Sequence, residues 1–94
     1  ALCKENNVTF IAATMPIPAV TLSENWDSFE AADTYFSDYF KTQGVPYYNF
    51  NMEYYSAYSH DASMYVDYDG HMNGDSARAF SKLFGKMVLQ KELN

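Results

Sequence analysis

Two carboxylates and a histidine lie close together in the final third of the chain. Asp67 and Asp69 precede His71 by four and two residues, and the pattern predicts an amphipathic helix directly after them. A carboxylate that binds one ring N–H of a histidine leaves the other ring nitrogen free to take a proton. These residue types could therefore form the acid–base part of a catalytic triad, with His71 as general base and Asp67 or Asp69 orienting its ring. A helix-start histidine among acidic loop residues, without a catalytic role, fits the same spacing.

The chain offers no serine nucleophile in the context that this chemistry needs. Gly74-Asp75-Ser76 has the composition of a nucleophile triplet, but it follows His71 and opens the predicted helix instead of ending a strand. We expect Gly74 and Asp75 to contribute ordinary helix-capping chemistry and Ser76 to play no nucleophilic role.

The segment DYDGHMNGD also has the alternating oxygen-bearing side chains of a calcium loop. The twelfth position of an EF-hand loop carries a glutamate that binds calcium through both oxygens. Counted from Asp67 that position is Arg78, and counted from Asp69 it is Phe80. Neither position holds a glutamate, so a small calcium-stabilised interaction domain is only a minor alternative. We predict no metal or other cofactor.

Two further residues, His60 and Cys3, are expected to have no functional role. His60 lies beside Asp61 in an aromatic, polar stretch and is expected to be a solvated loop histidine. Cys3 is the single cysteine and is expected to pack as a small hydrophobe. A single cysteine excludes an internal disulfide and a multi-cysteine zinc site.

Composition and charge limit the classes of function. The 94 residues suffice for one small domain, and 48% apolar with 18% aromatic residues is typical of a globular chain. The formal charge of −6 repels phosphate, so we predict no nucleic-acid partner and no attachment to anionic membranes. No apolar run approaches the roughly 20 residues that cross a bilayer, so no membrane span is predicted in this segment.

The first half of the chain predicts a strand followed by a helix. Residues 8–15, VTFIAATM, are typical of a strand buried on both faces, and Pro16 and Pro18 force an extended exit. Helical spacing then runs from 25 to 43, with Ser23 or Asn25 as its cap and Gly44 at its end. The apolar stripe of this helix comprises Trp26, Phe29, Ala32, Phe36, Tyr39 and Phe40, with Asp33 at its edge near water.

The second half predicts a strand, a loop and a helix. Residues 45–50 form a short strand, 51–65 a long ordered loop with one helical turn, and 75–91 an amphipathic helix capped by Asn73 or Asp75. The apolar stripe of the last helix comprises Ala77, Phe80, Leu83, Phe84, Met87 and Val88. The order strand, helix, strand, loop, helix predicts a layered α/β architecture with parallel strands.

Two strands are too few for such a sheet to be stable alone. The opening letters ALCKENN are typical of the exit from a helix, so we expect further sequence upstream of Ala1. The rest of the sheet is therefore expected in that segment of the same domain or in another chain. An open sheet edge also allows a homodimer.

The order of these elements and one motif resemble the C-terminal half of an SGNH (GDSL-like) hydrolase. Bacterial cell-envelope members of that superfamily carry Asp-x-x-His-Leu-Asn before a helix with a small residue and a Phe. Residues 66–73, VDYDGHMN, followed by Ala77 and Phe80, are similar to that block. FIAATMPIP and VPYYNFN are similar to the last two strands of the fold. The resemblance implies that residues 1–94 are the C-terminal portion of a single SGNH domain, with a flavodoxin-like three-layer sheet.

The resemblance also implies a function. His71 would activate a serine for acyl transfer, either ester hydrolysis or O-acylation, on a small-molecule or glycan ester. The family places its acid three residues before the histidine, where Tyr68 stands here; a one-residue insertion would make Asp67 the equivalent, with Asp69 the second choice. The nucleophile and the oxyanion hole lie upstream in the family, so this chain alone would be inactive. The implied location is the bacterial cell envelope or outside the cell, and the alternative is a non-catalytic binding or assembly module of the same fold.

Overall fold

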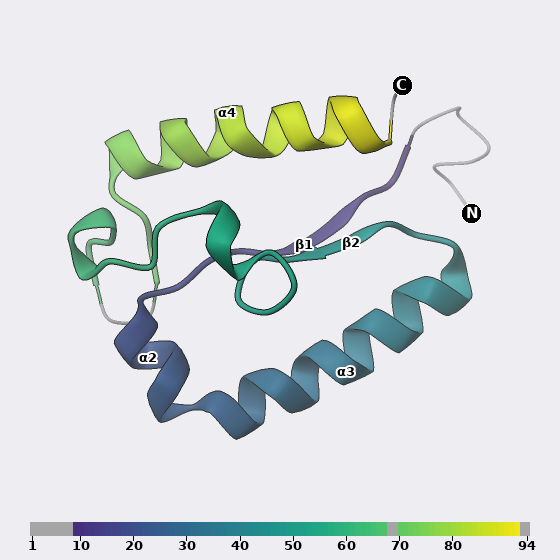
Figure 1. Ribbon diagram of the computed structural model, residues 1–94, viewed down its shortest axis with the longest axis horizontal. Coiled ribbons are helices and arrows are strands. Elements are labelled where there is room, and N and C mark those ends of the chain that lie inside the picture. Colours follow the sequence, from purple (N-terminus) through teal and green to yellow (C-terminus); the bar gives the residue numbers. More distant parts are fainter. Residues whose placement is uncertain (1–8, 68–69, 93–94) are drawn as a thin grey trace.

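The computed structural model describes residues 9–67 and 70–92 (Figure 1). The elements, in chain order, are β1 (Ala12–Thr14), α2 (Ala19–Glu24), α3 (Trp26–Gln43), β2 (Tyr47–Asn49), the 3-10 turns η1 (Tyr55–Ala57) and η2 (Ala62–Met64), and α4 (Gly74–Lys91). The predicted α/β class is confirmed, and the loop 51–65 carries two short 3-10 turns where one helical turn was expected. Over the described ranges, no helix is both long and apolar enough to cross a membrane.

The two strands pair in parallel, as predicted, with Ala12 aligned to Tyr47. The ladder ends where Phe50 N donates to Thr14 O at 3.0 Å. In a parallel pair, alternate residues direct their backbone groups toward the partner strand. Because Ala12 and Thr14 face β2, the backbone of Ala13 faces the opposite edge, where the described residues supply no further strand.

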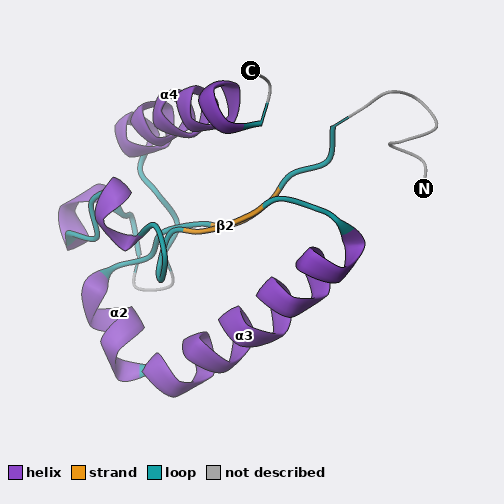
Figure 2. Cartoon of the chain, turned by 45° about the vertical axis from the view of Figure 1, so that its right-hand side comes forward, coloured by secondary structure: helices purple, strands orange, loops and turns teal. Residues whose placement is uncertain are grey.

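The sheet separates two helical layers (Figures 1 and 2), with α4 on one face and α3 on the other. Alternation along β2 sends Tyr48 toward α4, where it joins Phe50 and Phe80 in the buried core. Its neighbour Tyr47 points to the α3 side and stacks on Phe40 with ring centroids 5.3 Å apart. Aromatic side chains therefore fill both interfaces of this small sheet.

Helix α2 was not predicted. The two prolines indicated an extended exit from β1, but Pro18 has a φ of −56° and immediately precedes Ala19, the first residue of the helix. Its carbonyl accepts the N–H of Leu22 at 3.0 Å, which is the first turn of α2. A proline cannot donate a backbone hydrogen bond, and that group is unneeded at a helix start. Ser23, proposed as a cap, lies inside α2 instead.

Helix α3 starts and ends at predicted residues, because Asn25 occupies its N-cap position and Gly44 follows its last turn. Asn25 makes no side-chain capping bond; its amide instead donates to Thr21 O at 2.9 Å and closes the turn between α2 and α3. Gly44 ends α3 as predicted, with the left-handed φ of 69° that glycine adopts at no steric cost.

The first layer is less buried than its sequence suggests. Val8 lies outside the described residues, and the strand itself, Ala12–Thr14, is half-buried, so the prediction of burial on both faces is wrong. Helix α3 contains no buried residue, and Phe36 and Tyr39 are 41% and 51% exposed. Two short strands do not offer α3 enough surface to cover its apolar stripe.

Candidate acid–base site

The loop between η2 and α4 is a tight reversal of the chain. Tyr65 and Met72 form an isolated antiparallel bridge. Inside it, Val66 N donates to His71 O at 2.7 Å. Val66 and His71, the two ends of this segment, are therefore adjacent, and this brings Asp67 close to His71. Residues 68 and 69 between them are not described.

The side chain of Asn73 joins this loop to both of its neighbours, α4 and η2. Asn73 Oδ1 accepts the N–H of Ser76 at 2.8 Å and caps α4, so of the two predicted caps Asn73 is the one used. Its Nδ2 donates to Ser63 O, in η2, at 2.9 Å. The other candidate, Asp75, instead pairs with Arg78 along the helix surface.

Asp67 contacts His71 through both carboxylate oxygens. Oδ2 lies 2.5 Å from His71 Nδ1. Oδ1 accepts the backbone N–H of Gly70 at 3.0 Å and of His71 at 3.1 Å. The carboxylate cannot rotate away from the ring without losing those two backbone bonds, so ring and loop fix each other.

These contacts favour the charged carboxylate. The backbone N–H of His71, then its ring, and more weakly the N–H of Gly70, hold the pKa of Asp67 below its usual range. The side chains of His71 and Asp67 are 74% and 42% exposed, so water screens the pair. The arrangement therefore orients a ring and contributes little to stability.

The geometry sets the chemical capacity of His71. A carboxylate only accepts hydrogen bonds, so Nδ1 must carry the proton. In the neutral ring the lone pair is then on Nε2, which has no hydrogen-bond partner among residues 9–67 and 70–92. This is the tautomer of a general base that awaits a hydroxyl.

The structure gives Ser76 partners other than this pair. Asp69 lies outside the described residues. Ser76 is 1% exposed, and its Oγ lies 2.7 Å from Tyr58 Oη, which also donates to the Ser76 carbonyl. A serine enclosed in α4 cannot reach a substrate, in agreement with the expectation that Ser76 is no nucleophile.

The expectation for His60 is wrong, because this residue is only 7% exposed. Its Nδ1 lies 2.8 Å from Ile17 O, and its Nε2 lies 2.8 Å from Tyr55 O. The ring stacks on Tyr55 at 3.9 Å between centroids, and its own carbonyl accepts the N–H of Ala19 at 2.8 Å. His60 therefore joins the start of α2 to η1. The only sequence signal was a histidine in an aromatic stretch, and the carbonyls that bind it are invisible to local pattern.

Where the structure describes the chain, no three His, Cys, Asp or Glu side chains are grouped to hold a metal ion. No protein-family model matches the chain, and comparison with curated proteins and with solved structures gives no significant match.

Proposed function

We propose that the chain is the acid–base part of an SGNH-like serine esterase or O-acyltransferase. His71 takes the proton of a serine hydroxyl at Nε2, and Asp67 holds the ring at Nδ1 and stabilises the imidazolium that forms. The observation that carries the proposal is the 2.5 Å contact between Asp67 Oδ2 and His71 Nδ1, with Oδ1 held by two backbone N–H groups.

The remaining machinery must come from elsewhere under this proposal. Acyl transfer also needs a nucleophile and hydrogen-bond donors for the oxyanion. We propose that these belong to an upstream part of the same domain, or to another chain, that adds strands at the free edge of β1. The unpaired backbone of Ala13 and the exposed Phe36 and Tyr39 support an added layer there. If a second chain supplies these strands, the simplest arrangement is a homodimer that pairs through the same edge of β1.

Substrate and location follow from the resemblance in sequence. The substrate class proposed is an ester of a small molecule or a glycan, handled in the bacterial cell envelope or outside the cell.

A non-catalytic binding module of the same fold is the alternative. It is favoured by the exposure of both dyad side chains and by a free His71 Nε2, to which no described hydroxyl donates.

The first test concerns the ring itself. Nitrogen-15 NMR on the 94-residue chain should find neutral His71 protonated at Nδ1, and Asp67→Asn should return it to the Nε2–H form common in exposed histidines. Asp61→Asn is a matched control, because Asp61 is also an exposed loop carboxylate with a lowered pKa but it binds Ser63 N. An Nε2–H ring in the unaltered chain would remove the basis of the proposal.

The second test concerns the reaction. A protein that joins this chain to its upstream segment should react with a fluorophosphonate serine probe. His71→Ala should abolish labelling and Asp67→Asn should lower its rate by about a hundredfold or more, whereas Asp61→Asn should leave it unchanged. Labelling that ignores His71, or no labelling at all, would favour the binding module.

A further inference from the structure

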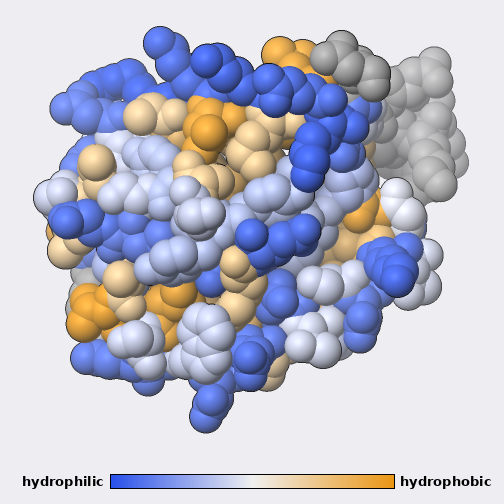
Figure 3. All heavy atoms as spheres, viewed as in Figure 1, coloured by the Kyte–Doolittle hydropathy of each residue, from blue (hydrophilic) through white to orange (hydrophobic). Residues whose placement is uncertain are grey.

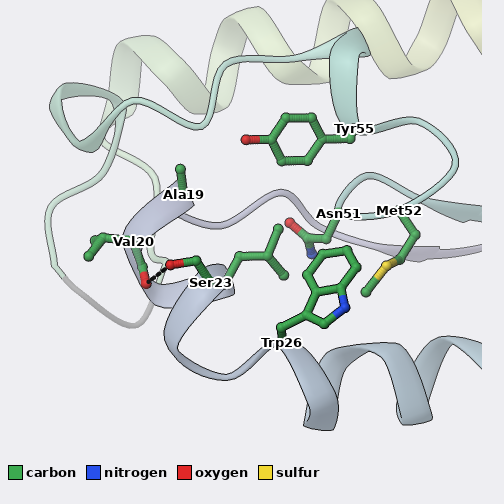
Figure 4. Close-up of a pocket in the computed structure, with 8 residues that line it drawn as sticks. Ala19, Val20, Ser23, Trp26, Asn51, Met52 and Tyr55 are labelled. Atoms are coloured by element: carbon green, nitrogen blue, oxygen red, sulfur yellow. Dashed lines mark hydrogen bonds between the residues drawn. The ribbon is translucent and has the colours of Figure 1, made fainter.

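A second feature of the surface is a hollow between α2, the start of α3 and the turn before η1 (Figure 4). Its volume is about 610 Å³. This falls within the range, roughly 300–1,000 Å³, that small-molecule sites occupy. Its lining residues include Val20, Ser23, Trp26, Asn51 and Tyr55. In Figure 3 apolar side chains reach the surface at the lower left, where Figure 1 places α2.

The hollow presents aromatic and aliphatic surface. Trp26 and Tyr55 flank it from different elements and are 43% and 42% exposed (Figure 4). Val20 is 48% exposed at its rim. Large aromatic side chains left open to solvent around a concavity are typical of a binding surface.

Two polar residues of the lining, Asn51 and Ser23, already make hydrogen bonds within the protein. Asn51 Oδ1 accepts the N–H of Ile17 at 3.0 Å, and its Nδ2 donates to Met15 O at 2.8 Å. Ser23 Oγ donates to Val20 O at 3.4 Å. A ligand therefore gains little from Asn51 and Ser23, and the aromatic and aliphatic lining favours an apolar or aromatic ligand body.

A smaller hollow adjoins the first and shares Ser23 and Trp26 with it. Its volume is about 250 Å³, and its remaining lining residues are Glu24, Asn25, Asp27 and Ser28. Two acidic residues therefore line the hollow that shares Trp26 with the larger one, and neither hollow is lined by Lys, Arg or His. The positive N-terminal end of the α3 dipole also lies at the smaller hollow, but the negative charge of Asp27 in the first turn compensates it.

We propose that the two hollows together bind a small organic cation with an apolar body. The body lies between Trp26 and Tyr55 in the larger hollow, and the ammonium group contacts the indole beside Glu24 and Asp27. Tryptophan is the best side chain for a cation–π contact, and nearby carboxylates add to the attraction. An anion of the same shape would meet repulsion from both carboxylates. This site is independent of the acid–base proposal, and either can fail without the other.

Trp26 is the only tryptophan of the chain and reports directly on the site. Benzyltrimethylammonium, titrated into the 94-residue protein at low salt, should change the fluorescence of Trp26 in a saturable way. Benzyl alcohol and phenylacetate, which have no positive charge, should bind about fivefold more weakly or worse. Equal binding of the three probes, or no saturable change, would overturn the proposal.

Variants identify the groups responsible. Glu24→Gln and Asp27→Asn should each weaken the binding of the cation by about two- to fivefold and leave benzyl alcohol unaffected. Asp38→Asn removes the same charge from an exposed position further along α3 and should have no effect. If Asp38→Asn weakened binding as much as Asp27→Asn, general attraction to an acidic protein would explain the result and the site would be rejected. Trp26→Phe should also weaken the binding of the cation more than that of benzyl alcohol, and a thermal-shift assay measures this without the tryptophan signal.

Discussion

Gly70 lies so close to Ile17 that a Cβ on the glycine would be 2.6 Å from Ile17 Cγ2. Its φ of 106° is also one that side-chain-bearing residues rarely adopt. The same residue donates its N–H to Asp67 Oδ1. The loop that carries Asp67 and His71 is thus attached to the exit of β1 at a point where only glycine fits.

Gly70→Ala should lower the free energy of unfolding by about 1–3 kcal/mol, because it adds both backbone strain and a clash. Urea denaturation measures the change. Gly85→Ala is the matched control: Gly85 lies in α4 with open space around its Cβ position, so alanine should stabilise the helix by up to about 1 kcal/mol. Stabilisation by both substitutions would contradict the contact with Ile17.

Acid should release the contact between Asp67 and His71. The folded pKa of Asp67 is lowered from an ordinary value of about 3.9, so its bonds stabilise the loop above that pH and are lost as the pH falls through the folded pKa. The amide signals of Gly70 and His71, followed by NMR from about pH 5 down to pH 2, should share a midpoint below 3.9. Asp67→Asn should remove that transition. A midpoint at or above the ordinary value would contradict the three-bond arrangement.

Local pattern predicted the parts of this fold that depend on neighbours in sequence. The span of α4, the αL end of α3 at Gly44 and the cap at Asn73 follow from side chains that act within a few residues. The contact between Asp67 and His71 is also local, because the two residues are four positions apart in one loop. The parallel pairing of β1 and β2 followed from the intervening helix.

The failures depend on distant partners. His60 is buried because its ring nitrogens lie against carbonyl oxygens 43 and 5 residues away, which accept hydrogen bonds, and no periodicity encodes these partners. Helix α2 was missed because proline was interpreted as a terminator, although it also suits the residue before a first turn. The exposure of α3 reflects the area of the sheet beneath it, which spacing alone cannot measure.

Alkali should unfold the protein through two buried tyrosines. Burial raises the pKa of Tyr48 and of Tyr65 to about 12, and the Glu92 carboxylate adds to the rise for Tyr48. A raised folded pKa means that stability is complete below the ordinary value of about 10 and is lost as the pH rises from there toward 12. Phenolate absorbance and circular dichroism should therefore change together in that range. Tyr35, which is 67% exposed, serves as control: Tyr35→Phe should leave the unfolding transition in place. An unfolding midpoint insensitive to this pH range would contradict the burial of the two phenols.

Removal of the ring should destabilise the protein at His60 and have little effect at His71. His60→Ala leaves the carbonyls of Ile17 and Tyr55 without their partner and opens a space beside the Tyr55 ring, so it should lower the free energy of unfolding by about 2–4 kcal/mol. His71→Ala removes an exposed ring and should change stability by less than about 0.5 kcal/mol. Urea denaturation followed by circular dichroism compares them directly. Trp26 fluorescence adds a local readout, because Ala19 and Tyr55 line the hollow that Trp26 flanks and His60 holds both in place. A larger loss of stability from His71→Ala than from His60→Ala would mean that the loop that carries Asp67 and His71, and not the buried ring, stabilises this end of the fold.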